Sequence, residues 1–252
     1  MTERSLSFGS VAAAYERYRP GYPDALVDEV LAYAAGPVRT ALEIGAGTGK
    51  ATRAFARRGI AVTATDPDAA MLAELRRHVP DTVTTRQARF EDLRPTQTYD
   101  LVFAAASLHW TDPQRRWPRV TALLDRAGTF ASFGGQVHVA DADLERAVVA
   151  ARAPYLPDDE VPSPDGTPEG SPLQWPGTEL AASELFTDVR QSTVERRATL
   201  SPHAYVGHLS TVSAYLSLPA SVRDEVLARI LAVLPEQVVV TADVVLHLAR
   251  VA

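Results

Sequence analysis

Residues 40–50, which read TALEIGAGTGK, decide the fold. The first five are mostly apolar, which is typical of a buried strand, and three of the next five are glycines. Glycine lets a backbone turn sharply and approach a ligand closely. A helix that begins at Lys50 would direct its free N–H groups towards an anion or a carboxylate. The stretch therefore predicts a strand, a ligand-binding turn and a helix in direct succession.

Outward from this stretch, short apolar runs alternate with amphipathic ones. Strands are expected over residues 40–44, 60–65, 82–86, 100–105 and 128–133, and helices over 50–58, 67–78 and 113–124. Such alternation is typical of a parallel sheet with helices on both faces, whose buried strands are apolar throughout. We therefore predict a doubly wound, Rossmann-like α/β fold whose binding core spans residues 36–135.

The segments that flank this core can cover its ligand. Residues 1–35 form an N-terminal arm with a helix expected over 24–34, and residues 154–177 hold seven of the 18 prolines, which predicts a loop. Alternating strands over 188–198 and 237–251 enclose two helical stretches broken at Pro219, so we expect a terminal hairpin with a helical insertion at 200–235. Ligands of open α/β sheets bind beyond the carboxyl ends of the strands, where the arm and the insertion can both reach them.

Composition excludes several classes of function. The chain has 252 residues, 46% of them hydrophobic, which fits a single domain with an insertion. Its net charge of −6 disfavours nucleic acid as a partner. The absence of cysteine excludes disulfides, zinc–thiolate sites and iron–sulfur clusters, and no set of His, Asp and Glu has metal-ligand spacing. No apolar run approaches the ~20 residues of a membrane helix, so we expect a cytoplasmic protein, monomeric or homodimeric, with no membrane partner.

Three ligands can account for the glycine turn. A phosphate loop requires a glycine where Ile44 stands and a Ser or Thr where Ala51 stands, which excludes ATP and GTP at this site. A dinucleotide fingerprint requires its third glycine where Lys50 stands, so NAD or FAD fits less well. The third candidate is S-adenosylmethionine, which the rest of the sequence favours.

Residues 43–49, EIGAGTG, resemble the first motif of class I S-adenosylmethionine-dependent methyltransferases. The resemblance implies that the turn lies under the methionine part of the cofactor and that Glu43 supports the turn or the cofactor's amino group. The turn residues concerned are Gly45, Ala46, Gly47, Thr48 and Gly49. Asp66 ends the second strand, 21 positions after Gly45, and its carboxylate can accept both ribose hydroxyls. Asp66 could instead cap the helix that follows, before Pro67.

Two further stretches resemble the small-molecule members of the same family. Residues 88–93, ARFEDL, resemble the turn that contacts adenine, and residues 104–110, AAASLHW, resemble the end of strand four, where small residues pass the sulfur. The Asn/Asp-Pro-Pro-Tyr/Phe signature of base- and glutamine-methylating enzymes is missing there. The cofactor contacts that these motifs and their flanks imply, beyond the glycine turn and Asp66, are Tyr18, Arg19, Pro67, Met71, Arg89, Phe90, Glu91, Ala104 and Ala105.

The ends of the chain also resemble this family. The arm, with FGSVA at residues 8–12, and the insertion, with TVSAY at 211–215, are similar to bacterial methyltransferases of the trans-aconitate and ubiquinone/menaquinone types. The resemblance implies one domain over residues 1–252 and a mostly parallel seven-stranded sheet with an antiparallel C-terminal strand. It also implies an arm that lies over the active site and an insertion that forms part of the acceptor pocket.

Methyl transfer from a sulfonium is an in-line displacement, so positioning is the main task of the protein. A base is needed only where the acceptor loses a proton, and His109 is the candidate, with Tyr15 closing over the reacting groups. Arg19 could hold an acceptor carboxylate instead of the cofactor. Further candidates for the acceptor pocket are His203, Tyr205, His208 and Tyr215. We predict methyl transfer to a small molecule, first of all to an oxygen atom of a secondary metabolite or a small carboxylic acid. A nicotinamide-dependent oxidoreductase and a non-catalytic S-adenosylmethionine-binding protein remain the alternatives.

Overall fold

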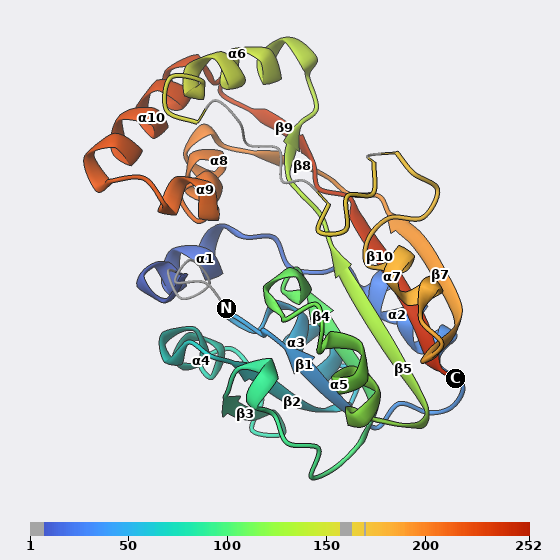
Figure 1. Ribbon diagram of the computed structural model, residues 1–252. Helices are drawn as coiled ribbons and strands as arrows, with labels where there is room; N and C mark the ends of the chain where they lie inside the picture. The colour runs from blue at the N-terminus through green and yellow to red at the C-terminus, as the bar shows by residue number, and fades with distance from the viewer. Residues whose placement is uncertain (1–7, 157–162, 169) are drawn as a thin grey trace.

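A seven-stranded sheet forms the centre of the computed structural model, which describes residues 8–156, 163–168 and 170–252 (Figure 1). Its strands are β1 (Thr40–Ile44), β2 (Ala61–Asp66), β3 (Thr84–Gln87), β4 (Tyr99–Ala105), β5 (Leu124–Gly134), β7 (Phe186–Val194) and β10 (Val244–Val251). They are arranged in the order β3-β2-β1-β4-β5-β10-β7, and β10 runs antiparallel to both of its neighbours. This order confirms the predicted doubly wound, mostly parallel sheet.

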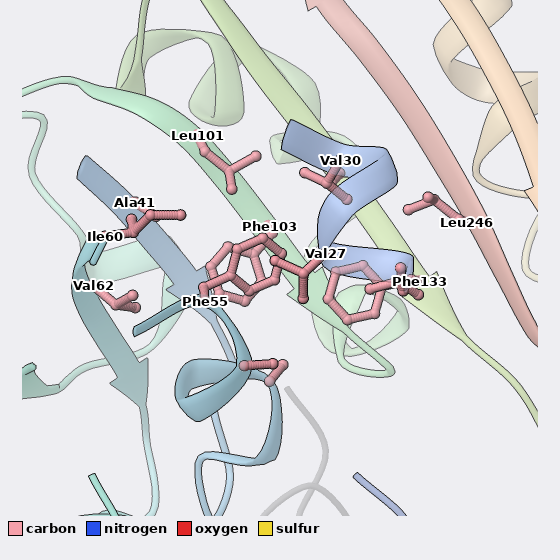
Figure 2. Close-up of a cluster of buried hydrophobic side chains, with 14 of the residues drawn as sticks. Val27, Val30, Ala41, Phe55, Ile60, Val62, Leu101, Phe103, Phe133 and Leu246 are labelled. Carbon is pink, nitrogen blue, oxygen red and sulfur yellow. The ribbon is translucent and has the colours of Figure 1, made fainter. Parts of the chain in front are cut away.

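Helices cover both faces of the sheet. The helices α2 (Asp24–Tyr33), α3 (Lys50–Ala56) and α4 (Ala69–Leu75) lie on one face, and α5 (Arg116–Leu123) and α7 (Gly177–Ala182) on the other. On the first face the rings of Phe55, Phe103 and Phe133 pack together, with centroids of Phe55 and Phe103 4.4 Å apart (Figure 2). Alternate residues of β4 point to the two faces, which explains why the strand is apolar throughout.

A second unit, which we call the cap, stands over the carboxyl ends of the strands (Figure 1). It contains β6 (His138–Val139), α6 (Ala142–Arg152), β8 (Arg197–Leu200), α8 (Pro202–Leu209), α9 (Ser213–Leu216), α10 (Ala220–Val233) and β9 (Val238–Thr241). Its strands form a separate sheet in the order β6-β9-β8, and its helices pack around a hydrophobic core of their own that includes Val226 and Ile230. The N-terminal helix α1 (Ala12–Tyr18) lies between the cap and α4.

The terminal hairpin differs from its prediction. Each expected strand is two strands, because the chain breaks at residues 195–196 and at 242–243 and each half enters a different sheet. The alternation of apolar residues continues through the break, since Val240 faces the core of the cap and Val244 faces the core of the main sheet. The insertion has three helices instead of two, and α6 and β6 were not expected.

The described residues of the proline-rich stretch contain neither helix nor strand before Gly177. The helix α7 begins at Gly177. Residues 157–162 and 169 of this stretch, like residues 1–7 of the arm, lie outside the described residues. Within the described part of the chain, no helix is long and apolar enough to cross a membrane.

Candidate active site

Two cavities meet beyond the carboxyl ends of β1 and β4. One, which we call the Asp66 cavity, is lined by Phe8, Ile44, Asp66, Pro67, Met71, Ala88, Phe90, Ser107, Trp110 and Thr111. The other, the Arg19 cavity, is lined among others by Arg19, Glu43, Ala46, Thr48, Lys50, residues 135–137, Arg196 and His208. Tyr15, Gly45, Gly47, Ala105 and Ala106 line both. This junction places the glycine turn and the end of β4 at the centre of the site.

The glycine turn adopts a backbone that side chains would not permit. Gly45, Gly47 and Gly49 have φ angles of 67°, 54° and 82°, in the left-handed region. A Cβ on Gly45 would lie 2.6 Å from Cβ of Ser107, and one on Gly49 would lie 2.6 Å from Cγ of Leu75. Gly47 is different, because the nearest atom to its added Cβ would be Cε of Met71 at 3.6 Å. Side chains therefore pack against the turn at Gly45 and Gly49, whereas space remains beside Gly47.

Asp66 fixes the turn at the end of β2. Its Oδ2 accepts a hydrogen bond from the Gly47 N–H at 2.9 Å, and its Oδ1 accepts one from the Asp68 N–H at 2.8 Å. Burial raises the pKa of this carboxyl. The interpretation of Asp66 as a helix cap is wrong, because α4 begins at Ala69 and Asp68 caps it by accepting the N–H of Ala70. Asp66 is thus held with its carboxylate against the cavity.

Glu43 is buried at the wall of the Arg19 cavity. Its Oε2 accepts a hydrogen bond from the Thr52 hydroxyl, whereas Oε1 has no partner among the described residues. Burial, with a smaller contribution from Asp66, raises the pKa of Glu43 to about 8. A buried carboxyl oxygen without a partner is costly, and a ligand N–H or ammonium group would relieve that cost. Glu43 could therefore accept a hydrogen bond from a cationic group of a ligand.

Aromatic rings from the arm and from the end of β4 close the Asp66 cavity. Phe8 meets Tyr15 edge-on at 6.1 Å between centroids and Trp110 at 6.4 Å. Phe90, only 3% exposed, lines the same cavity from the 3-10 helix that follows β3. The cavity is therefore lined by aromatic rings at one end, and among the described residues its one carboxylate is that of Asp66. This combination suits an aromatic base joined to a sugar.

The arm is tied to the turn and to the cap. Glu16 forms ion pairs with Lys50 at 3.4 Å and with Arg53 at 2.8 Å, both on the helix that follows the glycine turn. Tyr18 packs its ring against α8, where a Cβ added to Gly207 would lie 2.6 Å from Cε1 of the ring. Tyr18 therefore joins the arm to the cap and is not among the residues that line either cavity.

Arg19 reaches from the arm into the second cavity. Its Nε and Nη2 donate hydrogen bonds to the hydroxyl and the carbonyl of Thr211 at 2.9 and 3.0 Å, and its Cζ lies 5.2 Å from the centre of the Tyr15 ring. His208 is buried in the same wall, where desolvation and then the Arg19 charge lower its pKa to about 3. The cavity thus combines a fixed guanidinium with an imidazole that is neutral near pH 7.

His109 does not reach either cavity. It lies on the short 3-10 helix at residues 108–110, with its ring 4.6 Å from that of Trp110, and its pKa is lowered to about 4 by desolvation and by Arg116. Of the four further candidates in the insertion, only His208 is among the described residues that line the cavities. The imidazole at the site therefore comes from the cap and not from the end of β4.

The structure brings most of the predicted site residues together. Those that line a cavity are Tyr15, Arg19, Glu43, Gly45, Ala46, Gly47, Thr48, Asp66, Pro67, Met71, Phe90 and Ala105. Those that do not are Tyr18, Gly49, Arg89, Glu91, Ala104 and His109. Glu91 instead accepts a hydrogen bond from the Asp112 N–H at 2.9 Å. Arg196 and residues 135–137 were missed, because only strand pairing brings them to the site. No group of three or more His, Asp and Glu in the described chain could hold a metal ion.

Comparison with known proteins agrees with this geometry. Residues 41–128 match the model of a family described as a methyltransferase domain. An uncharacterized methyltransferase of Mycobacterium tuberculosis is 34% identical over 228 residues, which cover 90% of this chain and 85% of the relative. Trans-aconitate 2-methyltransferase of Escherichia coli is 36% identical over 92 residues, 35% of this chain and 36% of that protein. A solved structure from Anaeromyxobacter dehalogenans, described as a type II methyltransferase, has a TM-score of 0.63 at 24% identity and covers 92% of this chain and 98% of its own.

The strand order and the glycine turn are those of a class I methyltransferase fold. The chain belongs to the S-adenosylmethionine-dependent methyltransferases, and S-adenosylmethionine is its cofactor. This decides between the cofactors that the glycine turn left open. The residues present fit such a group, because Gly47 leaves space beside the turn, and Glu43, which lines the Arg19 cavity, has a buried oxygen without a partner among the described residues.

Proposed function

We propose that this methyltransferase transfers the methyl group to an oxygen atom of a small molecule that binds in the Arg19 cavity. The observation that carries the proposal is the enclosure of this cavity by three parts of the chain. The arm contributes Tyr15 and Arg19, the main sheet contributes the glycine turn, and the cap contributes His208. A space walled in this way suits a small acceptor better than a nucleic acid strand. The name of the Escherichia coli relative, trans-aconitate 2-methyltransferase, supports an acceptor of this size.

The cofactor would lie across both cavities. Asp66 would accept the ribose hydroxyls, while Phe90, Pro67 and Met71 would contact the adenine end. The methionine part would pass Gly47, with Glu43 at its amino group and Arg19 at its carboxylate. Bound in this way, S-adenosylmethionine supplies a methyl group that is activated by the positive charge of its sulfur. The junction at Tyr15 and Ala105 is then the place where the acceptor must present its oxygen.

The two histidines near the site argue against strong general-base catalysis. His109 lines neither cavity, and His208, with a pKa of about 3, holds a proton poorly. His208 can accept a hydrogen bond from the acceptor and so orient it. Rate enhancement would then come from positioning, and an acceptor oxygen that is already ionised would need no base at all.

A labelled-methyl assay tests the proposal. The purified protein is incubated with trideuteromethyl S-adenosylmethionine and a metabolite extract, and S-adenosylhomocysteine and labelled products are measured by mass spectrometry. We expect labelled small molecules, and S-adenosylhomocysteine formation that depends on the extract. Label found only in protein or nucleic acid would contradict the proposal, as would product formation that is the same with and without extract. The Gly47→Arg variant is the inactive control.

A further inference from the structure

We propose that the acceptor is a small organic anion and that Arg196 holds its carboxylate. The inference rests on the proposed function, because it assumes that the acceptor occupies the Arg19 cavity. It adds the chemical class of the acceptor and the residue that selects it. Arg196 lies in the two-residue segment between β7 and β8, at the base of the cap, and lines the cavity from there.

Arg196 is fixed in place but has donors to spare. Its backbone N–H donates to Oδ1 of Asp243 at 2.7 Å, and its Nη1 donates to the carbonyl of Gly21 in the arm. No carboxylate of the described residues lies within ion-pair distance of its guanidinium. A guanidinium carries five N–H donors in a planar fork that matches a carboxylate. The side chain is thus anchored at one corner, with the remainder of the fork available to a ligand.

The charges of the cavity wall do not balance. Its cationic residues are Arg19, Lys50 and Arg196, and its acidic residue among the described ones is Glu43. Lys50 is compensated by Glu16 at 3.4 Å, and Glu43, with a pKa of about 8, is largely protonated near pH 7. Neither guanidinium therefore forms an ion pair with a carboxylate of the residues that the structure describes. Partly buried charges of the same sign favour a ligand of the opposite sign.

The cofactor can compensate only one of the two. S-adenosylmethionine has one carboxylate, together with an ammonium and a sulfonium, so its binding adds positive charge to the cavity overall. We assign Arg19 to that carboxylate, because its Cζ lies 5.2 Å from the centre of the Tyr15 ring, which lines both cavities. Arg196 reaches the cavity from the segment between β7 and β8, where its Nη1 donates to the Gly21 carbonyl, and it is left for the acceptor. An acceptor with a carboxylate completes the charge balance that the cofactor leaves open.

The transfer is simplest when the nucleophile is an oxygen at the other end of the acceptor, away from the carboxylate that Arg196 holds. The acceptor oxygen forms a bond to the methyl carbon as the carbon–sulfur bond breaks, and the electron pair of that bond stays on sulfur. Where the attacking oxygen belongs to a carboxylate, no proton has to leave, which agrees with the low pKa of His208. Arg196 keeps the other end of the acceptor away from the methyl group and so orients it.

Calorimetric titration of the protein saturated with S-adenosylhomocysteine tests this assignment. The probes are succinate and its neutral analogue succinamide, and the variants are Arg196→Gln and Arg197→Gln. Arg197 is exposed and is the next residue along the chain, so it is a matched control for the loss of one positive charge. We expect succinate to bind the parent protein and Arg197→Gln alike, and Arg196→Gln about 10-fold or more weakly, the loss of one charge-assisted contact. Arg196→Lys should recover part of the affinity.

Two results would overturn the inference. One is succinate binding that is equal in Arg196→Gln and Arg197→Gln, and the other is succinamide binding as tightly as succinate. Affinity for S-adenosylhomocysteine, measured first on each variant, shows that the cofactor site is folded. Turnover separates this inference from the proposed function: if only neutral acceptors are methylated, the anion site is wrong and the methyl transfer stands. If succinate binding depends on Arg196 but no small molecule is methylated, the anion site stands and the proposed function fails.

Discussion

The two cavities are built in different ways. Apart from Phe8 and Tyr15, the described residues that line the Asp66 cavity all lie between 44 and 111, within the range matched by the methyltransferase family. The Arg19 cavity draws on segments from residue 15 to residue 244. The first is shaped by turns and apolar rings, and the second by charged side chains on separate elements. A binding site made by neighbouring turns is determined by the fold. A site assembled from distant segments depends on the side chains of the individual protein.

Gly47→Arg should have the largest effect, because Gly47 lines both cavities and is open in front. We expect the Kd for S-adenosylhomocysteine to rise about 100-fold or more, a loss of about 2.8 kcal/mol, because the side chain fills the junction. Calorimetry measures it. Gly36→Arg, at an exposed glycine with no atom within 4 Å of its added Cβ, is the control and should bind normally. Equal binding by both variants would place the cofactor elsewhere.

Glu43→Gln should change how stability depends on pH. The folded protein keeps the Glu43 proton up to a pKa of about 8, whereas the unfolded chain loses it near the ordinary glutamate pKa of 4.5. The free energy of unfolding of the ligand-free protein should therefore be highest below this interval and should fall as pH rises through it. In Glu43→Gln this contribution is absent, so the fall should be smaller. Urea unfolding at about pH 5 and pH 8 measures the free energy of unfolding of the parent protein and of Glu43→Gln. An equal fall in both proteins would show that Glu43 is ionised when buried.

Asp66→Asn tests the contact to the ribose on the Asp66 side. The amide keeps the shape but loses the charge that strengthens bonds to hydroxyl donors, so we expect about 10-fold weaker binding of S-adenosylhomocysteine. Asp68→Asn is the matched control, because Asp68 caps α4 outside both cavities and asparagine caps equally well. Should the two variants bind equally, Asp66 would act only on the turn.

Gly207→Ala should have the smallest effect, and it should affect the Arg19 cavity more than the Asp66 cavity. The added Cβ would lie 2.6 Å from the Tyr18 ring, so α8 and the arm must move apart. We expect about 5-fold higher KM for the acceptor, or about 1 kcal/mol, with affinity for S-adenosylhomocysteine within about twofold. Initial-rate kinetics and calorimetry together measure the split. A parallel loss of cofactor affinity would show that the arm position controls both cavities.

The local part of the site was predictable and the assembled part was not. Glycine turns and the acidic residue at the end of a strand follow from spacing along the chain, so the sequence predicted Gly47 and Asp66, and both line the Asp66 cavity. The sequence did not distinguish Phe90 from its neighbour Glu91. A 3-10 helix after β3 turns Phe90 to the cavity and directs Glu91 to the Asp112 N–H. His109 was misplaced for the same reason, since the turn after β4 carries its ring away from the cavities.

Arg196 shows why the remainder could not be read from sequence. Its neighbourhood depends on the pairing of two segments 46 residues apart, in which the Ala242 N–H donates to the carbonyl of Arg196 at 2.8 Å. Alternating apolar residues predicted the hairpin correctly but carried no sign of the break in its strands. The fold of the core was therefore predictable, while the break that places Arg196 at the cavity required the three-dimensional arrangement.

The pairing of Leu200 with Val238 has a consequence for how acceptor selectivity can change. The three helices between these two residues leave the small sheet and return to it at the same place. They are therefore attached to the sheets only at these two ends, although they also pack against α6 and α1. Exchange of this segment for one from a relative would change the cavity wall at His208 in a single step, while Gly47 and Asp66 on the main sheet stay as they are. The new segment must then also supply a partner for Arg19 in place of Thr211.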